Sequence, residues 1–528
     1  MRQLRLSVAF LLSLVPSTAL AQDPKATPSF RLDSLRAIAV RPGNSQKVPV
    51  ALNRDGHDKP ITLTAANLPE GVTIETVTVP KGSEEATLIV VVAENAQPRV
   101  RSAVLNATDG TITSRDALVI RVADAEEKLP PGMLDLDVMK KYLEESDSYA
   151  SLRRRGSIGG RFTTKTKQAL ADYYGGTPES EVAVMTGLAW LAKTQQPDGS
   201  WSLLEAATEE GSSGSGGSGS EKATPDENLT AATAFALLPF LAEGVTHKYA
   251  PQGQPELAGY KEVVQKGLIF LASRQTRTSN VNDGNLGGGT YAHAIGTIAL
   301  CEAYGLSGDD RTRFNAQLAL KYLLQSQHRA GGGWRYGPNQ AGDMSVTAWV
   351  FLGIRSAQLT GIPVLPAVLE RASRFVDSCA AGPSEVVNSR YAYTPGTESK
   401  LSLSAAGLLT RQYLGWEKDT KDLVTGCAYL MENKPPTSAT SLGNIYYYYY
   451  ATQVLHHMEG TDFDLWNHLV REHVLRTQEK DGPNAGSWSP KGVDWGDKGG
   501  RMYATALAML TLQAPYRHLP MFRQFKLY

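Results

Sequence analysis

The chain has 528 residues, with 53 basic and 53 acidic side chains and 42% hydrophobic residues. This length exceeds what one hydrophobic core organises, since domains usually run about 100 to 200 residues and a single core stops growing near about 300. We therefore expect two or more domains. The balanced charge argues against a nucleic-acid partner, because binding to phosphates needs a concentrated basic face.

The first 21 residues are typical of a signal peptide. Two arginines precede an apolar run over residues 6–15, and Ala19-Leu20-Ala21 has the small-x-small pattern that signal peptidase accepts. The apolar run is shorter than the roughly 20 residues that span a bilayer, which disfavours the alternative, a membrane anchor. We predict an exported protein, periplasmic or extracellular, with no transmembrane segment after signal cleavage.

Residues 22–127 alternate in the period of β-strands, as in residues 47–52 and 86–92, and turn formers such as Pro69-Glu70-Gly71 separate the runs. Several short strands with turns at this spacing predict a β-sandwich. It resembles the immunoglobulin-type modules that precede catalytic or binding domains in exported bacterial proteins, although it lacks the Cys and Trp signature of antibody domains. The resemblance implies a spacer, or a docking module for a protein partner. Residues 128–175 are predicted to be a connector.

From residue 176 onward the sequence becomes helical and repetitive. One helix of each pair carries Leu-x-x-x-Gln near its end, at residues 191–195, 271–275 and 323–327, with residues 474–478 as a variant. A Gly-rich turn follows, closed in three pairs by Trp201, Trp334 or Trp488, and a second helix rich in small residues then begins. Six such second helices open near residues 229, 293, 345, 403, 445 and 502.

Six helical hairpins predict an all-α (α/α)6 toroid over residues 176–528, because each amphipathic pair buries only one stripe by itself and must stack on its neighbours. We expect small residues to let the second helices crowd around the centre. The glutamine should bond unpaired backbone groups at a helix end, and the tryptophan should cover the junction. An open solenoid is the alternative. Residues 209–222, rich in Gly and Ser, are predicted to be a disordered loop.

The turns at residues 195–201 and 327–334 resemble the repeat motif of the squalene cyclase, terpenoid cyclase and prenyltransferase family, over about residues 179–513. The resemblance implies an α/α toroid with a central cavity at one mouth. Squalene cyclases protonate an alkene with the middle Asp of Asp-x-Asp-Asp-Thr-Ala. Here the segment is Asp343-Met344-Ser345-Val346-Thr347-Ala348. Because a serine hydroxyl is too weak an acid to create a carbocation, class II cyclase activity is predicted to be absent.

The three cysteines, Cys301, Cys379 and Cys427, cannot form a full disulfide framework, and none has another Cys or a His within four residues, as a zinc site requires. Protein prenyltransferases hold zinc through Asp, Cys and His, and complement-like toroids carry a Cys-Gly-Glu-Gln thioester, but neither motif is present. We predict buried thiols, no metal and no cofactor.

Helix starts and the preceding turns of a toroid should converge on one end, where a ligand would be contacted. Aromatic rings with a few polar groups suit an apolar or a carbohydrate ligand. The structural alternatives are that Trp334 and Trp488 only hold their turns, that Asp343 caps its helix and that His293 is a hydrogen-bonded core residue. The candidate ligand-binding residues are Asp283, Tyr291, His293, Trp334, Tyr336, Asp343, Tyr391, Tyr393, Trp488, Asp494, Arg501 and Tyr503, with Trp495 beside Asp494.

Five tyrosines occupy consecutive positions, residues 446–450, on one predicted helix. Their rings must point all round the helix, so they are either buried between layers or partly presented to the cavity. His456 and His457 follow, but adjacent helical positions do not share a face, which disfavours a two-His metal site.

The leading hypothesis is an exported binding or scaffold protein without cyclase activity. One alternative is a lipid- or isoprenoid-modifying enzyme in which Asp343, Asp283 or Asp494 replaces the lost acid. The other is a polysaccharide lyase or glycosidase on a helical toroid, with Tyr291 and His293, or Arg501 and Tyr503, as the reactive groups. Asp343 is the catalytic candidate.

Overall fold

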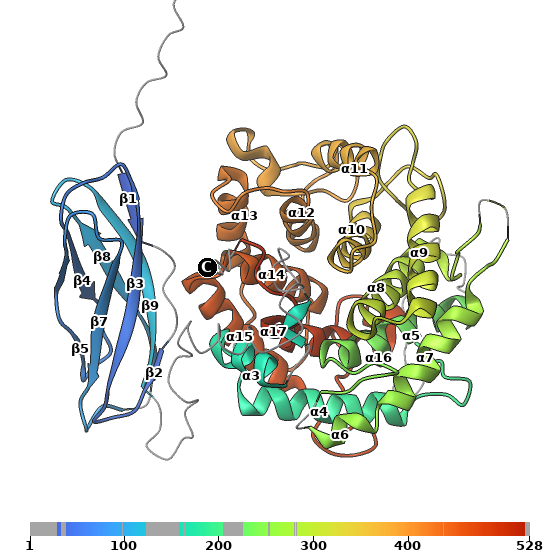
Figure 1. Ribbon diagram of the computed structural model, residues 1–528, viewed down its shortest axis with the longest axis horizontal. Coiled ribbons are helices and arrows are strands. Elements are labelled where there is room, and N and C mark those ends of the chain that lie inside the picture. Colours follow the sequence, from blue (N-terminus) through green and yellow to red (C-terminus); the bar gives the residue numbers. More distant parts are fainter. Residues whose placement is uncertain are drawn as a thin grey trace, which may run out of the picture.

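The computed structural model describes residues 29–32, 38–97, 99–122, 158–161, 164–203, 225–251, 254–278, 280, 282–436 and 438–522. A β-domain is followed by a helical domain (Figure 1), which confirms the predicted multidomain order. The predicted signal peptide and the predicted Gly/Ser loop lie outside the described residues, as do residues 128–157 of the connector. Among the described helices, none combines the length and the apolarity needed to cross a membrane.

The β-domain consists of two sheets with the strand orders β1-β3-β7-β5 and β2-β9-β8-β4-β6, and their inward side chains share one hydrophobic core. Neighbouring strands are antiparallel except for β2 and β9, which pair in parallel. The strands are β1 (Ser29–Leu32), β2 (Ile38–Val40), β3 (Ser45–Asp55), β4 (Ile61–Ala66), β5 (Val72–Ile74), β6 (Val77–Val79), β7 (Glu85–Val92), β8 (Arg99–Thr108) and β9 (Thr113–Val122).

Strand β7 illustrates why this sequence forms strands. Leu88, Val90 and Val92 are buried, whereas Ile89 and Val91 on the opposite face are each 42% exposed. Successive side chains of a strand point to opposite faces, so alternate positions build the core. The strand pattern read from the sequence is thus present in the fold, while the kinship with immunoglobulin-type modules stays a prediction.

The helical domain contains six helix pairs in two layers. The outer helices are α4 (Pro178–Lys193), α7 (Lys261–Arg274), α9 (Asp310–Gln325), α11 (Pro366–Ser378), α13 (Lys421–Glu432) and α15 (Thr461–Thr477). The inner helices are α5 (Pro225–Ala242), α8 (Gly289–Ser307), α10 (Met344–Leu359), α12 (Leu401–Tyr413), α14 (Ile445–Met458) and α16 (Gly496–Leu512). Short helices α6 (Pro255–Ala258) and η2 (Ser384–Ser389) lie in the connections.

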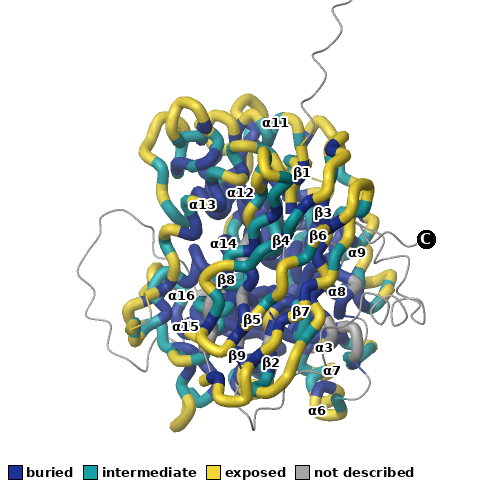
Figure 2. Tube along the Cα trace, turned by 90° about the vertical axis from the view of Figure 1, so that its left-hand side faces the viewer, coloured by how far each residue is buried: buried dark blue, intermediate teal, exposed yellow. Residues whose placement is uncertain are grey.

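The inner helices close into a ring (Figure 1). Each inner helix packs against the next along the chain, and α16 packs against α5; in the outer layer, α15 contacts α4. Figure 2 shows exposed residues mainly in the connecting turns and on the outer helix α11, while the inner helix α12 is mainly buried. The ring confirms the predicted toroid and excludes the open solenoid.

Glutamine side chains join neighbouring helix pairs at four of the six junctions. The Gln327 amide donates to a glycine carbonyl of its own turn and to the Val368 carbonyl of α11, at 2.7 and 3.0 Å. The glutamines of the first two turns make equivalent bonds to α7 and α9. Gln478, in the last turn, donates to the Ala183 carbonyl of α4 at 2.8 Å and so joins the last pair to the first.

The tryptophans of the turns bond the end of their own outer helix. The Trp334 indole donates to the Leu323 carbonyl at 2.8 Å, and its backbone N–H donates to the Thr347 hydroxyl of α10 at 3.1 Å. Leu323 lies in the last turn of α9, where carbonyls have no partner within the helix. The Trp334 indole bonds the Leu323 carbonyl, whereas the Gln327 amide bonds a carbonyl of its own turn and one of α11. The expectation that the glutamine bonds these unpaired carbonyls is therefore wrong. Trp201 and Trp488 repeat the arrangement.

The last part of the predicted connector belongs to the helical domain. η1 (Gly159–Arg161), α3 (Thr164–Tyr173) and α17 (Ala514–Arg517) contact one another, and α17 contacts α14. Arg161 of η1 donates to the Leu241 carbonyl at the end of α5, at 3.2 Å. These segments therefore cover the end of the ring where the inner helices finish.

Candidate functional site

The turns that start the inner helices are bonded to each other at one end of the toroid, which we call the mouth. The Thr290 N–H, in the first turn of α8, donates to the Tyr336 carbonyl in the turn before α10, at 3.0 Å. The Met344 N–H at the start of α10 donates to the Tyr393 carbonyl in the turn before α12, at 2.8 Å. The predicted convergence of helix starts is therefore present here.

Asp343 is the N-cap of α10 and is fully buried. Its Oδ1 accepts the Val346 N–H at 2.9 Å and the Ser345 hydroxyl at 2.7 Å, which is the usual bonding of a capping aspartate. Its Oδ2 has no hydrogen-bond partner among the described residues, and the nearest cation is the Arg335 Nε at 3.9 Å. Asp343 thus caps its helix with one oxygen and keeps the other available.

Three tyrosines and one arginine lie beside Asp343 at the mouth. Tyr291 and Tyr336 stack with ring centroids 6.3 Å apart, and the Tyr336 and Tyr393 hydroxyls hydrogen-bond at 2.7 Å. The Arg335 guanidinium lies over the Tyr336 and Tyr393 rings, at 5.6 and 5.7 Å. Tyr336 is 53% exposed, so its ring faces solvent. We call these four residues the tyrosine platform.

Behind the platform lie three buried tyrosine hydroxyls, on Tyr446, Tyr450 and Tyr503. None makes a hydrogen bond of ordinary geometry with the residues that the structure describes. Burial raises the pKa of Tyr446 and Tyr450 well above the usual value, and the neighbouring tyrosines add to this. Burial and the charge of Asp494 likewise raise the pKa of Tyr503. All three therefore remain neutral, able to donate and to accept hydrogen bonds.

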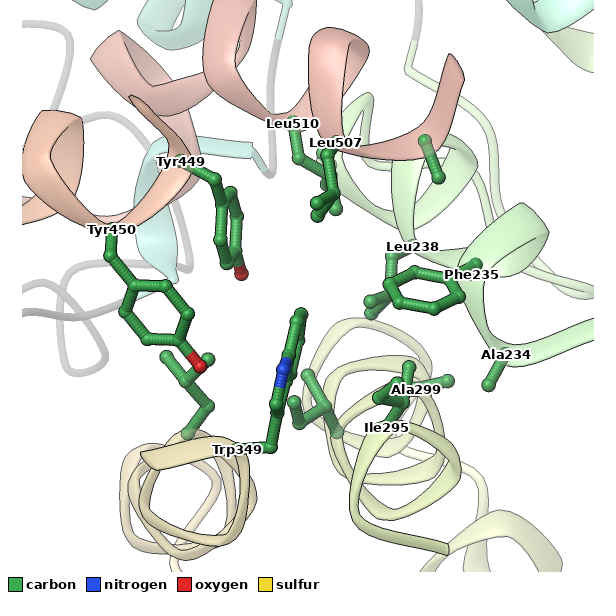
Figure 3. Close-up of a cluster of buried hydrophobic side chains, with 14 of the residues drawn as sticks. Ala234, Phe235, Leu238, Ile295, Ala299, Trp349, Tyr449, Tyr450, Leu507 and Leu510 are labelled. Atoms are coloured by element: carbon green, nitrogen blue, oxygen red, sulfur yellow. The ribbon is translucent and has the colours of Figure 1, made fainter. Parts of the chain in front are cut away.

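Trp349 of α10 extends among aromatic rings from other inner helices (Figure 3). It packs edge-on against Phe235 and Tyr450, at centroid distances of 5.7 and 5.8 Å, and stacks on Tyr449 at 5.6 Å. Leu507 of α16 lies nearby in the same cluster. The expectation of small residues around the centre is thus incomplete, because large rings fill this level of the ring.

The five consecutive tyrosines divide between the two layers. Tyr446, Tyr449 and Tyr450 contact Trp349 in the inner ring. Tyr447 donates its hydroxyl to a carbonyl of α13, and Tyr448 packs against rings of α15. All five side chains are buried, three among the inner helices and two between the layers, so burial, the first of the two alternatives, is what the structure shows.

Asp283 and His293 hold turns and are not exposed to a ligand at the mouth. Asp283 accepts from Lys321 of α9 at 2.8 Å. His293 is fully buried; its Nδ1 accepts the Leu286 N–H at 3.1 Å, and its Nε2 bonds the Ala319 carbonyl at 2.8 Å. Burial lowers the pKa of His293 to about 4, so it stays neutral near pH 7. Both nitrogens are occupied, which leaves no free base at this position.

Tyr391 and Arg501 are also bonded within the fold. The buried Tyr391 hydroxyl accepts from the Arg411 Nε at 2.9 Å. Arg501 donates to Glu479 at 2.6 Å and to the Ser487 hydroxyl at 3.1 Å. Like the turn tryptophans Trp334 and Trp488, these two side chains bond other parts of the helical domain and do not belong to the group at the mouth.

Asp494 and Trp495 are exposed in the turn before α16, where Trp495 is 61% exposed and Lys498 lies over its ring at 5.2 Å. Asp494 is close enough to raise the pKa of Tyr503 and Tyr448. The inner ring order places α16 three helices away from α10, so this exposed ring lies across the mouth from the tyrosine platform.

The structure thus groups Tyr291, Tyr336, Asp343 and Tyr393, with Tyr503 further in. Sequence reasoning missed Arg335 and did not assign Tyr446 or Tyr450 to the site. Arg335 stands between two aromatic candidates, Trp334 and Tyr336, so its position in the turn was a usable signal. The inward positions among residues 446–450 depend on how α14 is rotated, which the pattern of five identical residues does not reveal.

The described part of the chain holds no group of three or more His, Cys, Asp or Glu side chains arranged to bind an ion. Cys301, Cys379 and Cys427 are buried and free, which confirms the predicted thiols.

No protein-family model matches the chain, and no curated protein matches it. Among solved structures, the GH76A alpha-1,6-mannanase from Salegentibacter sp. HEL1_6 is 10% identical, with a TM-score of 0.43, over 64% of this chain and 98% of that one. The type II terpene cyclase MstE from Scytonema is 14% identical, with a TM-score of 0.40, over 64% and 98%. A family 76 glycoside hydrolase from a bovine Bacteroides thetaiotaomicron strain is 12% identical, with a TM-score of 0.42, over 93% and 98%. Likenesses this distant carry no argument about the activity of this chain.

Proposed function

We propose that the toroid is a binding module for a hydroxylated, ring-shaped ligand of the carbohydrate class, held at the mouth without chemical turnover. The observation that carries this proposal is the tyrosine platform beside the unpaired Asp343 Oδ2. Sugar rings offer apolar faces that pack on exposed aromatic rings, and hydroxyls that bond carboxylates, guanidiniums and phenols.

The buried hydroxyls behind the platform favour a hydroxylated ligand over a polyprene. A purely apolar ligand would leave the Asp343 Oδ2 and the Tyr503 hydroxyl without partners, and each buried polar group left unsatisfied costs roughly 1–3 kcal/mol. A ligand with several hydroxyls would supply these partners.

Binding is favoured over glycoside hydrolysis because hydrolysis requires two carboxyl groups on either side of the scissile bond. Asp343 is surrounded by tyrosines and Arg335, and no second carboxylate is recorded in contact with it among the described residues. Cyclase chemistry is disfavoured because Ser345 stands in the position of the acid, and its hydroxyl, which donates a hydrogen bond to Asp343, is too weak an acid to protonate an alkene.

Tyr336→Ala is expected to weaken oligosaccharide binding by about two- to tenfold, since it removes an exposed stacking surface worth about 0.5–1.5 kcal/mol. Titration calorimetry against a panel of neutral oligosaccharides and polyprenols would measure this. Phe314→Ala is the matched control, because Phe314 is an exposed ring on α9 that also lies beneath an arginine, at 5.2 Å, and should leave binding unchanged. Binding of polyprenols alone, or conversion of the oligosaccharide, would contradict the proposal.

We further propose that the protein is exported and that its β-domain is an immunoglobulin-type spacer or docking module. The N-terminal sequence supports the first part, and the two sheets around one core support the second. N-terminal sequencing of the protein recovered outside the cytoplasm should begin near Gln22. An intact Met1 in that fraction would refute signal cleavage.

A further inference from the structure

The end of the toroid opposite the mouth contains a group of buried arginines that the proposed function does not use. Glu302 and Arg355 lie near the ends of the inner helices α8 and α10, and His457 lies near the end of α14. Arg161 comes from η1 and Arg517 from α17, the segments that cover this end. We call these five residues the guanidinium cluster.

Glu302 is the centre of the cluster and has both oxygens occupied. Its Oε2 pairs with the Arg161 Nη1 at 2.6 Å, and its Oε1 pairs with the Arg517 Nη2 at 2.9 Å. Glu302 and Arg161 are fully buried, and Arg517 is 3% exposed. One carboxylate therefore balances two guanidiniums in a region from which water is largely excluded.

A third guanidinium, that of Arg355, increases the positive charge. It lies over the Tyr413 ring at 5.6 Å, and the charges of both Arg355 and Arg517 act on the Tyr413 hydroxyl. The further acid Glu243 acts on Arg161 by its charge, but its own hydrogen bonds go to Lys167, Gln513 and Tyr516. The Arg161 and Arg517 guanidiniums thus share the single Glu302 carboxylate as their direct ion-pair partner.

Several donors in the cluster have no acceptor within the described chain. These are the Arg161 Nη2, the Arg517 Nε and the single N–H of the neutral His457 ring, all on side chains that are at least nine-tenths buried. Buried polar groups in native proteins are almost always hydrogen-bonded, so convergent unpaired donors call for an acceptor. Arg355 and Tyr413 are only half-buried, which places the approach to these donors at the ends of α10 and α12.

We infer that the guanidinium cluster is a binding site for a small oxyanion, a phosphate or a carboxylate group, at the end of the toroid opposite the mouth. Guanidinium groups present parallel N–H donors that match the oxygens of such anions, and the bonds are charge-assisted. An oxyanion would accept hydrogen bonds from the unpaired Arg161, Arg517 and His457 donors and would add a second counter-charge for the two guanidiniums that share Glu302. The site is independent of ligand binding at the mouth.

The test is thermal unfolding of the mature chain with increasing inorganic phosphate or acetate, each compared with sodium chloride of equal ionic strength. Because a ligand that binds only the folded state stabilises it, we expect a saturable rise in Tm with at least one oxyanion beyond that with chloride. A response to phosphate alone assigns a phosphate group, and an equal response to acetate assigns a carboxylate.

Arg355→Gln should weaken the apparent affinity for the oxyanion at least about tenfold, the equivalent of one charge-assisted bond. Arg313→Gln is the matched control, because Arg313 also lies over a tyrosine, Tyr304, at 5.9 Å but is exposed on α9. His457→Gln provides a second test if Arg355→Gln fails to fold. Equal responses to chloride and oxyanions, or an unchanged affinity in a folded Arg355→Gln or His457→Gln variant, would overturn the inference.

Discussion

Glu302→Gln is expected to destabilise the protein by about 3–5 kcal/mol, because it leaves two buried guanidiniums, Arg161 and Arg517, without their counter-charge. The amide keeps the shape of the side chain, so the loss would report the charge rather than a packing defect. The variant should also separate η1 and α17 from the ring, since both arginines hold those segments to α8. Urea unfolding in phosphate-free buffer would measure the effect.

The control for this prediction is Glu262→Gln. Glu262 pairs with Lys266 one helical turn away on α7, at 2.8 Å, but both side chains are at least half exposed. Exposed ion pairs contribute little to stability, so this variant should unfold like the unmodified protein. If Glu302→Gln and Glu262→Gln changed the unfolding free energy by the same amount, the burial of Glu302 would not have the energetic role that we assign to it.

Lowering the pH from 7 to about 5 should strongly destabilise the toroid, because it contains several buried neutral histidines. Burial lowers the pKa of His293 and of His456 to about 4, and burial and nearby positive charges lower the pKa of His457 and His518 further. The unfolded chain takes up these protons below about pH 6.5 while the folded chain does not. Stability is therefore fully present above about pH 6.5 and falls as the pH drops toward 4, by about 1.4 kcal/mol per pH unit for each histidine.

Unfolding free energies measured between pH 7.5 and 5 would check this slope. His293→Gln should reduce the slope of the unfolding free energy against pH by the contribution of one histidine. Glutamine keeps a donor and an acceptor but does not titrate. A stability that is level down to pH 5 would contradict the account.

The sequence alone determined the order of the domains, the six helix pairs and the residues that join them. Gln327 and Trp334 were identifiable because each repeat places the same residue types at the same point of a turn, where local backbone groups need partners. The capping role of Asp343 followed from its position before Met344 for the same reason. Local patterns of this kind act over a few residues and therefore appear in the sequence.

Only the tertiary structure decided which polar side chains meet inside the ring. Arg161 reaches Glu302 across 141 positions, and its Nε reaches the Arg517 carbonyl across 356. The repeats predict a closed ring, but the rotation of each inner helix, which decides which side chains meet once α16 packs against α5, is not encoded by any periodicity. The same holds for the tyrosine platform and the hydroxyls behind it, because contacts between turns far apart in the chain exist only once all six pairs have closed.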